Sequence, residues 1–243
     1  MLLGTFTNAV SVLAGSAVGS VAGGRFPERV RETVMAGLGL LTAGIGIREV
    51  LEAESFVPVL AAVLVGGLIG ELLRIETGLT RFGDWLQRKL AGQIAEPDLD
   101  VELPEREKAR PHIPGSFSEG FVVASLVFCI GPLTVLGSIN DGLGDPELLF
   151  IKSGLDGFAS IAFSAIYGWG VALAAVTVLI IQGGIALAAG LLEDVLTDPM
   201  IAALASAGGV LLLGISLRLL DLKLIRVANL LPALVLAPVF AAL

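Results

Sequence analysis

Eight apolar segments, each long enough or nearly long enough to cross a bilayer, constrain this chain more than any other feature. They lie at about residues 4–23, 33–47, 57–73, 121–139, 148–167, 171–192, 200–217 and 227–243. The second segment is short, and Gly and Pro interrupt the fourth and fifth. Only 16% of the 243 residues are charged, whereas soluble domains carry about 25%. The sequence therefore predicts an all-α, polytopic membrane protein with about eight transmembrane helices.

The segments that connect these spans separate by charge. Of the 15 Lys and Arg residues, three lie at 24–32, seven at 74–110 and three at 218–226, which are connections on one side of the membrane. Acidic residues dominate the other connections, where Arg48 is the only basic residue. The positive-inside rule places the Arg-rich connections in the cytoplasm. We therefore expect a plasma (inner) membrane protein with both termini outside. No nucleic-acid partner is expected, although the net charge of −8 is not the argument, because what matters is where the charges lie relative to the membrane.

One connection, 74–117, is long enough to carry structure of its own. Its first part predicts an amphipathic helix on the inner membrane surface, with Trp85 beside an apolar stripe of Ile75, Leu79, Phe82, Leu86 and Leu90. The part at 95–115 is rich in Pro and charge, which predicts a flexible linker. A docking site for a partner is the alternative to a plain connector.

The sequence predicts an internal repeat at an offset of 170 residues, and chance similarity between spans rich in Gly, Leu and Ala is the alternative. Residues 36–50 align with 206–220, matching Gly39 to Gly209, Gly44 to Gly214, Ile45 to Ile215 and Arg48 to Arg218. Residues 57–64 resemble 231–238 after a four-residue gap. The repeat divides the chain into 1–73 (spans 1–3), 74–117, a central pair of interrupted spans at 118–170, and 171–243 (spans 6–8). An offset of five spans inverts the second copy, as in many secondary transporters.

Asp156 is the foremost candidate for a functional residue. A helix that starts near Glu147 places Asp156 about 14 Å deep, close to the middle of a bilayer core of about 30 Å. A carboxylate at this depth usually faces a partner or a water-filled path. Lys152 lies one helical turn earlier on the same face. The two residues predict a protonation or cation site, and the alternative is a structural ion pair that fixes helix register.

Two further sets of polar residues are candidates for binding a solute or ion. Gly131, Pro132 and Gly137 interrupt the fourth span, which frees backbone carbonyls to line a cavity. Nearby side chains add oxygen atoms for a hard cation, namely Thr134, Ser138, Asn140 and Asp141. The second set is Asn8, Gln182 and Asn229, of which the first two occupy roughly corresponding places in the repeats. Interhelical hydrogen bonds or a helix cap are the structural alternatives.

Several motifs in the same order resemble those of the bacterial YdfK/YqgA-like membrane proteins, a family labelled a domain of unknown function. They are GTFTNAVSVLAGSAVG, FPERVRET, VGGLIGE, FCIGPLTVLGSINDGLGDPELLFIKSGLDG, AGGVLLLGISLR and VANLLPAL. The resemblance covers nearly the whole chain. It implies a multi-pass inner-membrane protein, described in the family as a transporter, and it names no substrate.

These observations predict a secondary transporter of a small solute or ion, coupled to H⁺ or Na⁺, with its site near the bilayer midplane around Asp156. A membrane scaffold, assembly factor or sensor that acts through the cytoplasmic segment is the alternative. An enzyme is not expected, because one Cys (Cys129), one His (His112) and no HExxH or GxSxG motif provide no catalytic or metal centre. No cofactor is expected. The partners are the lipid bilayer and the solute, and the Gly-rich helix faces are compatible with a homodimer.

Overall fold

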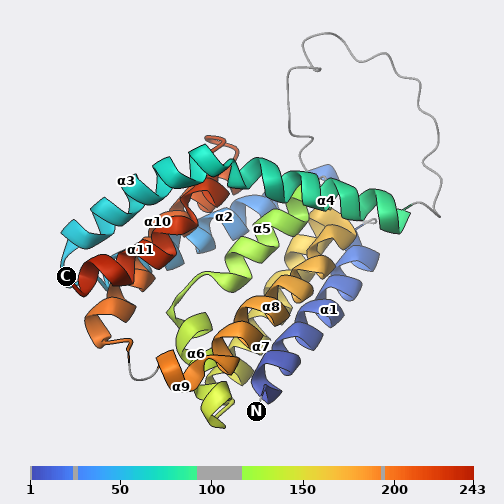
Figure 1. Cartoon of the computed structure of the whole chain (residues 1–243). Coiled ribbons are helices and arrows are strands. Elements are labelled where there is room, and N and C mark those ends of the chain that lie inside the picture. Colours follow the sequence, from blue (N-terminus) through green and yellow to red (C-terminus); the bar gives the residue numbers. More distant parts are fainter. Residues whose placement is uncertain (1, 24–26, 92–116, 193–194) are drawn as a thin grey trace.

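The computed structural model of the chain is a bundle of helices (Figure 1). It describes residues 2–23, 27–91, 117–192 and 195–243, and within these ranges it contains no strand. The helices are α1 (Leu3–Gly23), α2 (Glu28–Val50), α3 (Phe56–Leu73), α4 (Ile75–Ala91), α5 (Phe117–Cys129), α6 (Pro132–Leu143), α7 (Glu147–Tyr167), η1 (Gly168–Leu173), α8 (Ala174–Leu187), α9 (Ala189–Leu192), α10 (Asp198–Leu219), η2 (Val227–Leu230) and α11 (Pro232–Ala241). The all-α class expected from the apolar segments is confirmed.

Helices α5 and α6 form one apolar stretch that is bent by 66° at its middle. The bend lies at Gly131, whose φ of 126° is in the region that favours glycine, and the following Pro132 starts α6. The Thr134 hydroxyl donates to the carbonyl of Phe128 across the bend, at 3.2 Å. The interruption expected in the fourth span is therefore present, and it interrupts the regular backbone hydrogen bonding in the middle of the bundle.

Helices α1 and α7 run parallel and touch backbone to backbone. Gly15, Gly19 and Gly23 recur every fourth residue and face Gly157, Ile161 and Ala165 of α7, which have the same spacing. A Cβ atom added to any of these three α1 glycines would clash with a carbonyl oxygen of α7. Small residues spaced in this way let helices approach closely in lipid, where dispersion contacts replace the hydrophobic effect as the driving force.

We expect Gly19→Val to destabilise the protein by about 1–3 kcal/mol, because the side chain forces α1 away from α7. Gly184→Val is the matched control, since Gly184 is exposed on α8 and a Cβ there meets nothing within 4 Å. Thermal unfolding of the two variants in detergent measures the difference. Equal melting temperatures would contradict the close α1–α7 contact.

The second half of the bundle is built from two antiparallel helix pairs. Helix α2 packs along α10, with Gly39 against Leu220 at one end and Gly209 against Val50 at the other. Helix α3 packs in the same way on the last part of the chain, with Gly66 against Ala233 and Gly70 against Asn229. Glycine again marks the places where the helices are closest.

Helix α4 follows α3 after Arg74, which adopts a left-handed conformation with φ of 52°, and it passes over the end of α5 (Figure 1). Ile75 and Leu79 pack against the main apolar core, and the ring centroid of Phe82 lies 6.0 Å from that of Phe121. The expected amphipathic helix is present. The expected linker at 95–115 lies outside the described residues.

The expected count of eight spans is not confirmed. Within the described ranges, five helical stretches are long and apolar enough to cross a membrane, or six if the bent pair α5–α6 is one span. Two expected spans join into one stretch of 41 residues, Glu147–Leu187. The last expected span is only the short turn η2 and the 10-residue helix α11, which contains Pro238.

The 41-residue stretch is not a straight helix. Asp156 and Gln182 lie 26 positions apart, which would separate them by roughly 39 Å along a continuous helix. The Asn8 side chain nevertheless contacts both of them. The reversal occurs at Gly168, which has a φ of 70° and leads into the 3₁₀ turn η1. The chain therefore turns back, and helix α8 packs against α1, α5 and α6 and presents Gln182 to the same part of α1.

Candidate functional site

Four buried polar side chains meet where α7 and α8 each pack against α1; we call them the Asp156 cluster. Lys152 Nζ lies 2.9 Å from Asp156 Oδ1 and 2.7 Å from Oδ2. Asn8 Nδ2 donates to Asp156 Oδ2 at 2.9 Å and to Gln182 Oε1 at 3.3 Å. All four residues are at most 6% exposed. The structure thus brings the Lys152–Asp156 pair together with Asn8 and Gln182, which the sequence had offered as a separate set.

The two charged residues of the cluster pair because they lie four residues apart on one α-helix. Lys152 and Asp156 are one turn apart on α7, so they lie on one face of the helix, where Asp156 meets Asn8 of α1. The ammonium neutralises the carboxylate, and the Asn8 amide adds a second donor to the same oxygen. A carboxylate that is fully paired in this way can remain in an apolar bundle, whereas an unpaired one would be strongly destabilising.

Two polar atoms of the cluster lack a partner within the described part of the chain. They are the Asn8 oxygen Oδ1 and the Gln182 nitrogen Nε2, one acceptor and one donor. A buried polar atom left unpaired costs about 1–3 kcal/mol. The cluster therefore retains the capacity to bind a polar group of a ligand or a water molecule.

A cavity of about 440 Å³ lies beside the cluster. It is bounded by α2, the α5–α6 bend, α7 and α10, and both Lys152 and Asp156 line it. Most of the wall is apolar. The other polar residues of the wall are Thr42 and Glu49 of α2 and Thr134 of α6. The volume is within the range of small-molecule sites, about 300–1,000 Å³.

Glu49 is a residue of this cavity that the sequence analysis missed. It was assigned to an acidic outer connection, but α2 continues to Val50 and Glu49 is only 4% exposed. One oxygen lies 3.5 Å from Arg48 Nη2. The other, Oε2, has no hydrogen-bond partner among the described residues. Helical spacing could have indicated its position, because Glu49 continues the face of α2 that carries Leu38, Thr42 and Ile45.

Asp141 has the role of a helix cap. Its carboxylate accepts hydrogen bonds from the backbone N–H groups of Gly4 and Thr5, both at 2.9 Å, and from the Thr5 hydroxyl at 2.8 Å. These are groups that the first turn of α1 leaves without helical partners, and a negative charge there is favourable. Asp141, which was expected to bind a solute or ion, therefore connects the end of α6 to the start of α1.

The other candidates near the bend are held by the backbone. Ser138 Oγ donates to the Thr134 carbonyl at 2.6 Å, within α6. Thr134 bridges the bend, as described above, and is the one member of this group that lines the cavity. Asn140 lies near the end of α6, where its carbonyl accepts from the Asp145 amide at 2.8 Å. The hinge residues thus shape the wall of the site without joining the Asp156 cluster.

Asn229 belongs to a different network, where α3, α4, α5 and α10 meet η2. Its Oδ1 accepts from the Glu76 backbone N–H at 2.8 Å, and its Nδ2 donates to Glu71 Oε2 at 2.6 Å. At the centre of this network, Arg218 Nη1 lies 2.9 Å from Glu76 and its Nε lies 3.3 Å from Glu119. We call these the Arg218 network, and it ties α4 to the bundle.

The fold and the site define an all-helical membrane protein with a polar cluster and a cavity among its helices. The chain belongs to the family described as "Protein of unknown function (DUF554)", whose model matches residues 3–242. The resemblance noted from the motifs is thereby confirmed.

Two relatives cover nearly the full chain. It is 34% identical to "Uncharacterized protein YqgA" of Escherichia coli (strain K12) over 238 residues, which is 98% of this chain and 95% of the relative. It is 29% identical to "Uncharacterized membrane protein YdfK" of Bacillus subtilis (strain 168) over 243 residues, with the same coverage of 98% and 95%. No solved structure shows a significant match.

Proposed function

We propose that the protein is a secondary transporter whose solute site is the cavity beside the Asp156 cluster. The observation that carries this proposal is the position of the Lys152–Asp156 pair, which is buried between helices and at the same time lines a cavity. A pair that served helix register alone would have no need of adjacent open space. Ionisable residues inside a membrane bundle commonly mark substrate or ion pathways.

The bend between α5 and α6 supports the same proposal. Irregular backbone at membrane depth is tolerated where protein buries it or where it lines a water-filled cavity. Gly131 lies in the cavity wall, directly at the bend. Discontinuous helices beside a central site are a common feature of transporters that rock between two open states.

The α2–α10 contact supports an inverted repeat. Gly39 meets Leu220 and Gly209 meets Val50. Adding 170, the offset of the sequence repeat, converts Gly39 into Gly209 and Val50 into Leu220, so each contact is the counterpart of the other. The two helices are also antiparallel. These are the relations that an inverted repeat about a two-fold axis requires.

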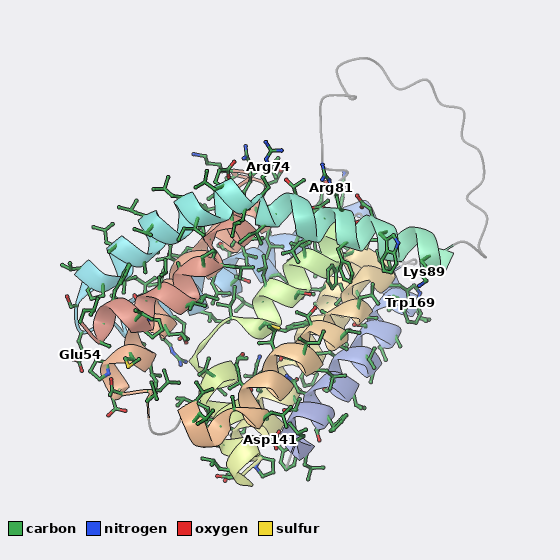
Figure 2. The ribbon with its side chains drawn as sticks, viewed as in Figure 1. Glu54, Arg74, Arg81, Lys89, Asp141 and Trp169 are labelled. Carbon is green, nitrogen blue, oxygen red and sulfur yellow. The ribbon has the colours of Figure 1, made fainter. Side chains whose placement is uncertain are left out.

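The charge distribution supports an orientation in the inner membrane with both termini outside. Arg74, Arg81 and Lys89 lie along the edge of the bundle formed by α3 and α4, and Asp141 lies at the opposite end (Figure 2). The positive-inside rule places the edge that carries Arg74, Arg81 and Lys89 in the cytoplasm. The scaffold alternative rests on the cytoplasmic segment, and α4, its helical part, is packed onto the bundle.

Flux through reconstituted liposomes tests the proposal. We expect one member of a panel of organic acids, amino acids and organic cations to accumulate when a Na⁺ or H⁺ gradient is imposed. The double variant Lys152→Gln/Asp156→Asn should abolish this uptake, because it removes both charges and leaves neither unpaired. Asp221→Asn, an exposed acidic residue, is the control that should retain it. Unchanged uptake in the double variant would rule out the Asp156 cluster as the transport site.

A further inference from the structure

We propose that the cavity binds an apolar organic cation and that Glu49 supplies the opposing charge. This inference names the class of solute for the transport site proposed above, and only the claim that this solute is transported rests on the proposed function. Binding itself does not depend on it.

The charges in the cavity wall favour a cation. The ionisable residues that line it are Glu49, Lys152 and Asp156. Lys152 and Asp156 neutralise each other through two contacts below 3 Å. Within the described wall, Glu49 is therefore the acidic side chain that no lining residue neutralises, because its neighbour of opposite charge, Arg48, lies outside the wall.

Glu49 is also incompletely bonded. Its side chain is 6% exposed, whereas that of its neighbour Arg48 is 70% exposed, and their 3.5 Å contact uses only Oε1. Oε2 meets no donor among the described residues. A buried carboxylate oxygen without a donor is costly, and a bound cation would remove that cost.

The rest of the wall selects an apolar body. Apart from Glu49 and the paired Asp156, the side-chain oxygens of the described wall are those of Thr42 and Thr134. A bare Ca²⁺ ion requires six to eight oxygen ligands, and the side chains of this wall offer fewer. Phe158 and Phe163 also line the cavity, and aromatic faces attract organic cations.

The cavity opens between α2 and α7 onto an apolar surface. Four residues of its wall are themselves well exposed: Leu41 at 69%, Ile45 at 53%, Leu155 at 61% and Phe158 at 78%. Both helices are long and apolar enough to span a membrane, so this opening faces the lipid. A ligand with an apolar body can enter by this route, whereas a strongly hydrated ion cannot.

Calorimetric titration of the full-length protein in lipid nanodiscs tests the inference. The probe is benzyltrimethylammonium, with tetramethylammonium as a cation without an apolar body and benzenesulfonate as an apolar anion. We expect benzyltrimethylammonium to bind at least tenfold more tightly than either. Glu49→Gln should weaken its binding at least tenfold, Glu49→Asp should restore most of it, and Arg48→Gln should change it less than threefold.

Several outcomes would overturn the proposal. They are no binding of benzyltrimethylammonium by the wild type, equal binding by a Glu49→Gln protein that melts like the wild type, or equal affinity for benzenesulfonate. Cross-links between copies through Phe158→Cys, with no probe bound, would assign the opening to a protein contact instead. Binding of benzyltrimethylammonium without any flux in liposomes would support this inference and contradict the transport function. Flux of another solute without binding of benzyltrimethylammonium would support transport and contradict this inference.

Discussion

Asp156→Asn is expected to destabilise the protein by about 3–5 kcal/mol, the cost of removing one partner from a buried ion pair. The substitution is nearly isosteric, so it leaves no cavity. Its effect comes from Lys152, whose side chain is 8% exposed and whose ammonium group would lose both carboxylate contacts. The Asn8 amide would lose a charged acceptor as well.

The double variant Lys152→Gln/Asp156→Asn separates charge from shape. We expect it to recover most of the stability lost in Asp156→Asn, because a neutral pair needs no counter-charge. Unfolding in mixed micelles, with Asp221→Asn as an exposed control, measures all three variants. If the single variant unfolds like the wild type, Lys152 must find water or another anion, and the pair is not closed off in the manner described.

Arg218→Met is the second substitution with a large expected effect, again about 3–5 kcal/mol. It removes the guanidinium that Glu76 and Glu119 share, and all three side chains are less than 10% exposed. Because Glu76 belongs to α4, we also expect α4 to loosen from the bundle. Hydrogen exchange of the backbone amides of α4 should report this locally, while thermal unfolding reports the global loss.

Arg226→Met is the matched control for this prediction. Arg226 pairs with Glu71, but their side chains are 68% and 56% exposed. Exposed ion pairs contribute about 0–1 kcal/mol. Losses of similar size in the two variants would show that burial does not distinguish the Arg218 network from an ordinary surface pair.

Some of the site was accessible from the sequence because its geometry is local. Lys152 and Asp156 are four residues apart in a helix, and helical spacing alone places them together. The bend at Gly131 was predicted for the same reason, since glycine and proline act on the backbone where they stand. The sequence offered Asn8 and Gln182 as polar residues at roughly corresponding places of the repeat, but it did not predict that they pair with each other.

Other residues could not be assigned from the sequence, because their roles depend on distant neighbours. Asp141 is a residue type that can bind a solute or an ion, and only the position of α1 in the fold shows that it caps this helix. Asn229 lies far along the chain from Glu71 and Glu76, which it contacts. Glu49 reads as part of an acidic loop until α2 is seen to extend through it into a cavity wall.

The sequence by itself determined the class of this protein: an all-helical membrane protein with a charged pair deep in an apolar helix. Those properties follow from composition, periodicity and spacing, which act over a few turns of helix, whereas its membership of the DUF554 family follows from the order of its motifs and from the family match. Only the tertiary structure decided which polar residues meet, which are caps, and that Glu49 and the Lys152–Asp156 pair share one cavity. Such relations depend on how helices far apart in the chain pack against each other. In apolar helices this packing is determined by small residues, and their positions in the sequence do not reveal which helix will be the neighbour.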